Sequence, residues 1–351
     1  MRKVGKLCVV LVIIFVLGVF IRPDYLIVMP GTTEGLGTLI ELEGETRKEE
    51  GEFFMVTVSQ QHVNVWGMLY GAFHPIIDVR PVSGSIPPGM TREEYNELMK
   101  SWMQDSQNLA RVIALRRAGY EVPIASEGVE VVELIEGSPA GGILKPGDII
   151  QEVDGKEVYL AEDVVKTIQG KSIGQSVNIL ISRDDVLQEK VVRTASNPEQ
   201  PETAALGIYV RTLNWQPLLP VSISIETGPV VGPSAGMMFV LEILDRLVPE
   251  NLTRGYKIAG TGTITLDEEV GGIGGVKQKV VAAEKAGADY FLVPKENYQE
   301  AFQVARNIEI VKVGSLDEVM NFLDDLELQA DSLLRPNMFT PWNFARVYGT
   351  P

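Results

Sequence analysis

Apolar and polar positions along the chain predict one long apolar segment followed by alternating helices and strands. Residues 7–21 form an unbroken run without a charged side chain, which is short for a membrane-spanning helix of about 20 apolar residues. Residues 51–58 predict a strand, and residues 75–90, rich in proline and glycine, predict a loop. A long helix is expected from Thr91, which forms a capping-box pattern with Glu94, to a stop near residue 119.

The second half of the chain predicts two units joined by a linker. Residues 128–193 combine strands, tight glycine turns and a short helix near 162–168, as expected of a small β-rich module. The polar segment 197–202 predicts the linker. Beyond it, strands are expected at 221–225, 258–265, 290–294 and 309–313, and helices at 233–247, 276–286, 298–306 and 316–323. This alternation predicts an enzyme-sized domain of the α/β or α+β class.

The apolar run near the N-terminus predicts a membrane anchor over residues 7–22. The run is preceded by Arg2, Lys3 and Lys6 and by no acidic residue. This charge bias favours residues 1–6 in the cytoplasm and the rest of the chain on the outer side of the membrane. A cleaved signal peptide is the alternative, but the small residues of a cleavage site are missing after the run. We therefore expect a single-pass protein of the cell membrane with an extracytoplasmic catalytic domain.

Composition narrows the classes of function. The 351 residues are 45% hydrophobic, enough for a sizeable core and for two or three domains. The net charge of −16 argues against a nucleic-acid partner, which would need clustered Lys and Arg. One cysteine and two histidines exclude a disulfide framework and leave no basis for a zinc or histidine metal site. No metal and no cofactor are expected.

Residues 228–239 carry a serine at the start of an apolar helix. Pro233 suits the first helical position, so Ser234 is expected in the first turn. Amide groups of a first turn lack helical partners and can stabilise an oxyanion at the positive end of the helix dipole. Gly232 and Ala235 are therefore candidate donors. From this segment alone, an ordinary serine at a helix start is an equal alternative.

Residues 271–280 form a glycine-rich turn that enters a second helix. Lys277 is expected at the start of this helix, between two valines. Burial and the positive helix end both lower a lysine pKa, and a neutral lysine can take the proton of a serine hydroxyl. Ser234 and Lys277 are therefore a workable nucleophile–base pair. Lys279 and Lys285 fit the role of solvated lysines better.

The β-rich module resembles a PDZ domain of the kind associated with bacterial proteases. The resemblance rests on the short motifs Gly137-Ser138-Pro139-Ala140, Gly147-Asp148-Ile149-Ile150 and Asp154-Gly155. It implies that the module captures an extended peptide as an added strand at a sheet edge. Gly128, Val129 and Val131 are expected near that groove.

The flanking parts resemble the proteolytic domain of the Lon protease family. The matching segments are Gly232-Pro233-Ser234-Ala235-Gly236, Gly260-Thr261-Gly262-Thr263-Ile264-Thr265, Gly274-Gly275-Val276-Lys277 and the later strand 290–294 with Asn297. Domains of this family use a serine nucleophile and a lysine base. The resemblance assigns these roles to Ser234 and Lys277 and places Thr261 beside the lysine.

Together the resemblances imply one protease domain interrupted by the PDZ module. The expected parts are the protease residues 30–122, the PDZ domain 124–196, the catalytic part 203–326 and a tail 331–351. The expected fold class is α+β, a mixed sheet with helices, a β-rich PDZ insertion and one N-terminal transmembrane helix. The whole is similar to PDZ-containing Lon-like proteases of bacterial membranes. That similarity implies an ATP-independent serine endopeptidase that acts on proteins or peptides, and Lon relatives add the expectation of a homo-oligomer.

One position departs from the family pattern. Many Lon domains carry an acid three residues before the serine, where this chain has Val231. The departure is expected to tune the site without abolishing the serine–lysine pair.

Three other functions compete with the protease. A catalytically silent PDZ scaffold at the membrane would need neither Ser234 nor Lys277, and the glycine-rich setting of both favours the enzyme. A P-loop NTPase would need a phosphate-binding loop, and the end of that motif matches Gly170-Lys171-Ser172. Val165 stands where the motif needs its first glycine, so no ATP site is expected. A Ser–His–Asp hydrolase would require His62 or His74 near the serine, and neither lies in a recognisable motif.

Overall fold

A six-stranded mixed sheet forms the centre of the larger domain, which is expected to be the protease and is called the protease domain below. The structure, a computed structural model, describes residues 2–43, 50–84, 86–87, 90–124, 126–198 and 200–326. The sheet has the order β18-β17-β14-β3-β1-β4. Its strands are β1 (Tyr25–Gly35), β3 (Glu52–His62), β4 (Asp78–Pro81), β14 (Lys257–Gly260), β17 (Tyr290–Pro294) and β18 (Glu309–Val313). β14 runs parallel to both β3 and β17, whereas β1 is antiparallel to β3 and β4. Because β3 precedes the PDZ module and β14 follows it, the domain is discontinuous, as the sequence predicts.

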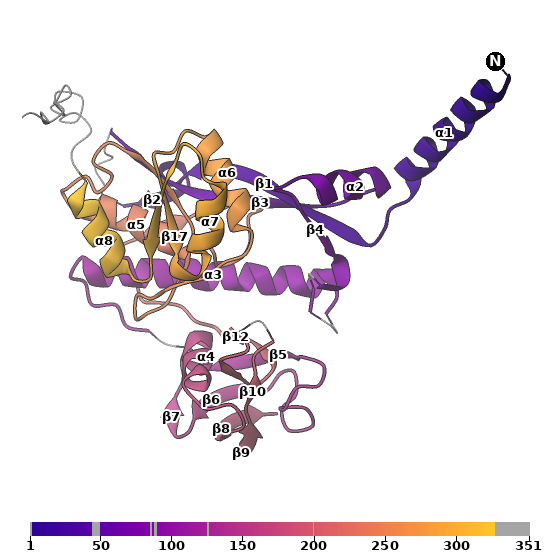
Figure 1. Cartoon of the computed structure of the whole chain (residues 1–351). Coiled ribbons are helices and arrows are strands. Elements are labelled where there is room, and N and C mark those ends of the chain that lie inside the picture. The colour runs from indigo at the N-terminus through magenta and orange to yellow at the C-terminus, as the bar shows by residue number, and fades with distance from the viewer. Residues whose placement is uncertain are drawn as a thin grey trace, which may run out of the picture.

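Helices cover both faces of this sheet (Figure 1). One face packs against α3 (Arg92–Arg117), α5 (Gly236–Leu247) and α8 (Leu316–Asp325) through a cluster that includes Phe53, Leu292 and Phe239. The other face packs against α6 (Val276–Lys285) and α7 (Tyr298–Val304) through a cluster that includes Phe291 and Val293. Successive residues of β17 therefore serve opposite cores, as alternation along a strand requires.

The predicted start of α3 is confirmed in detail. Thr91 is its N-cap and forms a reciprocal capping box with Glu94. α3 is the longest helix of the described residues and lies between the protease sheet and the PDZ module (Figure 1). It therefore touches both functional parts of the chain.

Short elements connect the main ones. The strand pairs are β2 (Ile40–Leu42) with β13 (Ile223–Ile225), β10 (Ala195–Ser196) with β11 (Ala204–Ala205), and β15 (Thr263–Ile264) with β16 (Val270–Gly271). Short 3-10 turns lie at Leu36–Thr38, Val82–Gly84 and Lys295–Asn297. β4 lies inside the segment 75–90 that was predicted as loop, because its residues complete the sheet edge beside β1.

The PDZ module is a separate sheet with its own core. Its strands are β5 (Val129–Leu134), β6 (Ile149–Val153), β7 (Lys156–Glu157), β8 (Ser176–Arg183), β9 (Val186–Arg193) and β12 (Ile208–Thr212), and its helix is α4 (Ala161–Gln169). The sheet order is β12-β5-β6-β8-β9, with β7 beside β6. Because β12 hydrogen-bonds to β5, the structural unit reaches residue 212, past the end predicted at residue 196.

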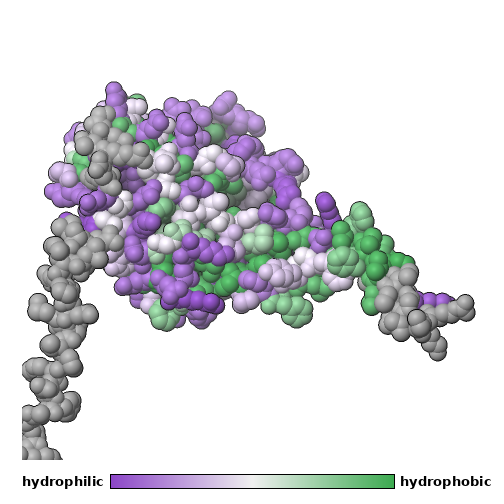
Figure 2. Space-filling model, turned by 90° about the horizontal axis from the view of Figure 1, so that it is seen from above, coloured by the Kyte–Doolittle hydropathy of each residue, from purple (hydrophilic) through white to green (hydrophobic). Residues whose placement is uncertain are grey.

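An arm extends from the protease domain on the side away from α8 (Figure 1). It consists of the outer ends of β1, β3 and β4 with α2 (Val65–Phe73) and α1 (Arg2–Phe20). The indole N–H of Trp66 donates to the Phe15 carbonyl over 2.9 Å, and the two rings stack. Apolar residues gather at this end of the molecule in Figure 2. Leu11, Phe20 and Phe73 are exposed by 56%, 78% and 87%.

Among the residues that the structure describes, no helix has both the length and the apolar character to cross a membrane. The predicted tail 331–351 lies outside the described residues.

Candidate active site

Ser234 lies in the turn that leads into α5. The helix begins at Gly236, three residues later than the predicted start at Pro233, so Ser234 precedes the first turn. Gly236 explains part of this arrangement, because a Cβ there would lie 2.6 Å from the Ser106 hydroxyl and 2.9 Å from Ile264. Glycine therefore lets the serine turn approach α3 and β15 closely.

The side chain that meets Ser234 is Lys279. Its ammonium nitrogen lies 2.7 Å from Ser234 Oγ and 2.8 Å from Thr261 Oγ1. Lys279 is only 3% exposed, and no carboxylate of the described residues forms an ion pair with it. Burial lowers the pKa of Lys279 to about 7, because the charged form loses its hydration without gaining a counter-ion.

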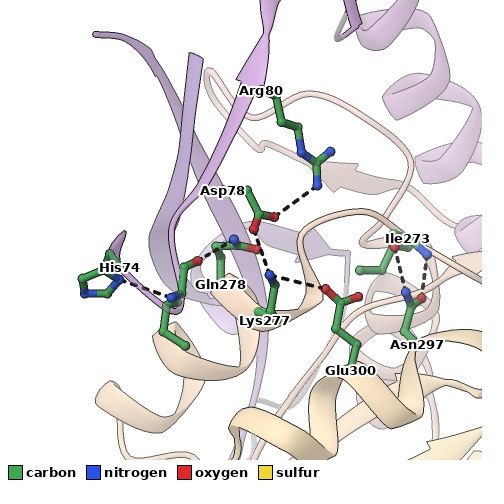
Figure 3. A network of polar contacts seen from close by, with 9 residues as sticks. His74, Asp78, Arg80, Ile273, Lys277, Gln278, Asn297 and Glu300 are labelled. Atoms are coloured by element: carbon green, nitrogen blue, oxygen red, sulfur yellow. Dashed lines mark hydrogen bonds and ion pairs between the residues drawn. The ribbon is translucent and has the colours of Figure 1, made fainter. Parts of the chain in front are cut away.

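The predicted contact between Lys277 and Ser234 is wrong. Figure 3 shows Lys277 between Asp78 of β4 and Glu300 of α7. Its nitrogen lies 2.8 Å from the Asp78 carboxylate and 4.0 Å from that of Glu300. Burial acts to raise the pKa of Asp78, but hydrogen bonds from Lys277 and Gln278 outweigh it and hold that pKa below its usual value. Lys277 is thus a structural cation.

Helical periodicity explains why Lys279, and not Lys277, contacts Ser234. Residues two apart on a helix point to nearly opposite sides, so only one of the pair can face the serine. Val276, Val280 and Ala283 form the buried stripe of α6, and Lys279 lies on that stripe. The signal was present in the sequence, as a lysine inside an apolar i, i+3, i+4, i+7 pattern.

Thr261 joins the serine and the lysine. Its hydroxyl donates to the Ser234 carbonyl over 2.9 Å and accepts from Lys279. The Gly262 amide donates to the same Ser234 carbonyl over 2.8 Å. The segment after β14 therefore holds both the turn that carries Ser234 and the nitrogen of Lys279. Thr261 was predicted to lie beside Lys277, but the lysine that it contacts is Lys279.

The amides near Ser234 differ in availability. Gly232 was predicted to be an oxyanion donor, and this prediction is wrong. Its amide already donates to the Met99 carbonyl over 3.0 Å. The Gly236 amide donates to the Pro233 carbonyl. The Ala235 amide has no acceptor within the described part of the chain. Of the two predicted donors, Ala235 is therefore the one that geometry leaves open.

A hollow of about 320 Å³ lies along α3 beside the serine turn. Residues 227–231 form one wall, and Lys100, Gln104 and Arg111 are among the α3 residues that form the other. Val231, the position that departs from the family pattern, lines this hollow and is 39% exposed. Val231 lies three positions before Ser234 in the chain.

The predicted peptide contacts of the PDZ module are wrong. Gly128, Val129 and Val131 lie at or in β5, which pairs with β12 on one side and β6 on the other. Val129 and Val131 have no exposed area. A strand with both edges paired cannot accept a peptide, because its backbone groups are already bonded.

β12 is one of the two edge strands of the PDZ sheet, and β9 is the other. A groove of about 290 Å³ runs between β12 and α4, lined by residues that include Val165, Ile168, Leu206 and Ile208. Val165 is 45% exposed although it is apolar. An exposed edge beside an apolar helix face has the form that captures an extended peptide. The signal was the strand pattern at 204–212, which was predicted to belong to the catalytic part, residues 203–326.

The PDZ module contacts the protease domain at two places. On one side, the Trp102 indole of α3 donates to the Val210 carbonyl of β12 over 3.3 Å. On the other, Glu162 of α4 accepts from the Leu266 amide over 2.8 Å, and Lys166 pairs with Asp267. Residues 265–269 follow β15, which begins two residues after Thr261. Both walls of the groove between α4 and β12 are thus connected to elements that hold the serine turn.

Comparison with known proteins agrees with this anatomy. The profile of the Lon protease (S16) C-terminal proteolytic domain matches residues 201–324, and that of the PDZ domain matches residues 103–194. The Lon protease of Azospirillum brasilense is 32% identical over 140 residues, covering 39% of this chain and 17% of the relative. The Lon protease of Chloroflexus aggregans is 25% identical over 232 residues, covering 65% of this chain and 25% of the relative.

Among solved structures, the PDZ domain of the SdrC-like protein from Listeria innocua is 28% identical, with a TM-score of 0.23, and covers 24% of this chain and 93% of that one. The two family matches show that the chain carries a Lon-type proteolytic domain together with a PDZ domain. It spans a quarter or less of the length of the Lon proteases named above.

Proposed function

We propose that the protein is an ATP-independent serine endopeptidase in which Ser234 is the nucleophile and Lys279 the general base. The observation that carries the proposal is the 2.7 Å contact between Ser234 Oγ and a lysine that is buried without a counter-ion. A lysine with a pKa of about 7 is half neutral at neutral pH, so it can accept a proton from a hydroxyl group.

The chemistry follows from these positions. Ser234 Oγ attacks the peptide carbonyl carbon while its proton passes to the neutral Lys279 amine, and the resulting ammonium then protonates the leaving amine. Water, activated by the same amine, hydrolyses the acyl-serine. The Ala235 amide, together with that of Ser234, is the proposed donor pair for the oxyanion. Thr261 keeps the lysine nitrogen directed at the serine through its hydroxyl.

A serine-reactive fluorophosphonate probe tests this assignment. We expect labelling and peptide cleavage in the wild type, and loss of both in Ser234→Ala and Lys279→Ala. Lys277→Ala serves as the matched control, since it removes a lysine of the same helix that faces Asp78. A wild-type protein that binds peptides but neither reacts with the probe nor cleaves any peptide would instead support the silent PDZ scaffold.

We propose that the groove between α4 and β12 selects protein substrates. Its apolar lining and open strand edge support capture of an extended segment, which raises the local concentration of substrate near Ser234. Val165→Asp should weaken cleavage of a protein substrate while a short peptide is cut normally. Val191→Asp, at another exposed valine of the same module, is the matched control. Equal loss for both substrates would assign the groove a structural role.

We also propose that α1 attaches the chain to the cell membrane, with residues 24–351 outside. The basic residues Arg2, Lys3 and Lys6 and the exposed apolar side chains of α1 support this proposal. Protease treatment of intact cells should digest the catalytic domain, and membrane pellets should retain the full-length chain. A mature N-terminus after residue 21, or a domain protected in intact cells, would contradict it.

A further inference from the structure

The hollow beside the serine turn has an unusual charge for this protein. In the whole chain, 47 acids outnumber 31 bases. The lining of the hollow contains two cations, Lys100 and Arg111, and no acid. Its remaining polar side chains, Gln104, Gln107 and Thr227, can all donate hydrogen bonds. A cavity of this kind attracts a negatively charged group.

Arg111 is the cation without a partner of opposite charge. Its Nη1 donates to the Asn108 side chain over 2.8 Å, whereas its Nε is buried and has no hydrogen-bond acceptor. No carboxylate of the described residues forms an ion pair with it. Burial lowers the pKa of the guanidinium, but arginine keeps its charge at any accessible pH. A half-buried charge without a counter-ion is costly unless a ligand neutralises it.

Lys100 at the mouth of the hollow is available as a second contact. It pairs with Glu97 over 2.7 Å, but both side chains are largely exposed, at 60% and 68%. Exposed pairs of this kind are weak and exchange readily, so a ligand can displace Glu97. Lys100 therefore adds attraction at the entrance, while Arg111 provides the fixed charge inside.

The hollow belongs to the same segment as the nucleophile. Its wall residue Val231 lies three positions before Ser234, and the intervening Gly232 is tied to Met99 of α3 by its amide. Pro233 is tied to the same helix, because its carbonyl accepts from Ser106 over 3.0 Å. A group bound in the hollow is thereby held at a set position relative to Ser234. Val231 also leaves the wall without a carboxylate of its own.

We propose that this hollow binds a carboxylate of the substrate, and that it makes the enzyme prefer an acidic group near the cleaved bond. The inference rests on the proposed peptidase function and deepens it by naming the class of substrate. The carboxylate has two sources, an Asp or Glu side chain or the free carboxyl end of a chain. The Arg111 guanidinium, Lys100 ammonium and the amides of Gln104 and Gln107 are its recognition groups.

Fluorogenic peptides in matched pairs test the proposal with the full-length protein. One set exchanges Glu for Gln at successive positions on both sides of the cleaved bond. The other set exchanges a free C-terminal carboxylate for its amide. In the wild type we expect kcat/KM to be about tenfold higher for the acidic member of one pair, as for a hydrogen bond to a charged group. The set that contains this pair identifies the source of the carboxylate.

Three variants assign the effect to the hollow. Arg111→Gln should reduce the ratio of kcat/KM between the acidic and the neutral peptide to about twofold or less. Arg193→Gln, which removes a charge from the exposed face of the PDZ module, should leave that ratio unchanged. Val231→Asp leaves Arg111 in place and supplies a carboxylate from the wall, so it should also erase the preference, even if Arg111→Gln proves unstable.

The outcomes separate this inference from the proposed function. A wild type that cleaves both members of every pair equally would overturn the inference and leave the peptidase intact. Discrimination that persists in both Arg111→Gln and Val231→Asp would also overturn it. A wild type that cleaves no peptide and does not react with the fluorophosphonate probe would instead remove the proposed function.

Discussion

The two lysines of the first turns of α6 occupy opposite environments. Lys279 lies in a dry pocket against two hydroxyl groups, while Lys277, two residues earlier, lies at a partly exposed site with two carboxylates (Figure 3). The first setting destabilises an ammonium and the second stabilises it. One helix thus carries a lysine suited to the proposed role of proton acceptor on one side and a structural cation on the other. Residue type alone does not distinguish the two roles.

The largest expected effect is from exchanging each lysine for arginine. Lys279→Arg should lower kcat for peptide cleavage by about a thousandfold or more, because a guanidinium cannot accept the serine proton. Lys277→Arg should remain close to wild type, because an arginine can still pair with Asp78. Steady-state kinetics and circular dichroism of both variants measure this contrast. Inactivity of Lys277→Arg with an active Lys279→Arg would reverse our assignment.

A substitution at Lys279 that abolishes cleavage should nevertheless increase folding stability. Lys279→Met removes a buried amine that disfavours folding, so the free energy of unfolding at pH 7 should rise by about 2–4 kcal/mol. The folded pKa of about 7 lies below the unfolded value, so the unfolded chain binds more protons above pH 7. Wild-type stability should therefore rise with pH across that window, and the advantage of the variant should shrink.

Urea unfolding at several pH values, with Lys277→Met as the control, measures this effect. Lys277→Met should show no gain, since its ammonium is paired and partly hydrated. A destabilised Lys279→Met at neutral pH would mean that the lysine is charged and well satisfied in the folded state.

The pH dependence of cleavage should report Lys279 alone. Activity requires the neutral amine, so kcat should fall about fiftyfold between pH 7 and pH 5 if the pKa is about 7. Asp78→Asn should leave the midpoint in place, because Asp78 faces the other lysine. Rates that are flat down to pH 5, or that rise only near pH 10, would contradict the assignment of a depressed lysine pKa.

The smallest expected effect concerns the pair of Asp78 and Lys277. Asp78→Asn should reduce the free energy of unfolding at pH 7 by about 0.5–2 kcal/mol, since the pair is only partly shielded from water. The depressed pKa of Asp78 means that this contribution is present at neutral pH and is lost as the carboxylate is protonated in acid. A double-mutant cycle with Lys277→Met measures the coupling, and strict additivity would show that the contact contributes nothing.

Local patterns in the chain determined most of the elements of the fold. The capping box at Thr91, the apolar alternation of β3 and β17, and the linker before residue 203 were all legible because they depend on neighbours in sequence. The PDZ and Lon-type motifs identified the two domains for the same reason. Ser234 was legible as a site because its turn has a distinctive local composition, although the start of α5 differs by a few residues.

Tertiary structure alone decided which lysine meets the serine and which strand forms the edge of the PDZ sheet beside α4. The rotation of α6 about its axis depends on packing against β1 and β3, and a difference of two residues moves a side chain to the opposite face. β5 lost its predicted peptide contacts because β12, from beyond the linker, covers its edge. Both outcomes depend on contacts between segments distant in sequence, so a pattern confined to one segment could not contain them.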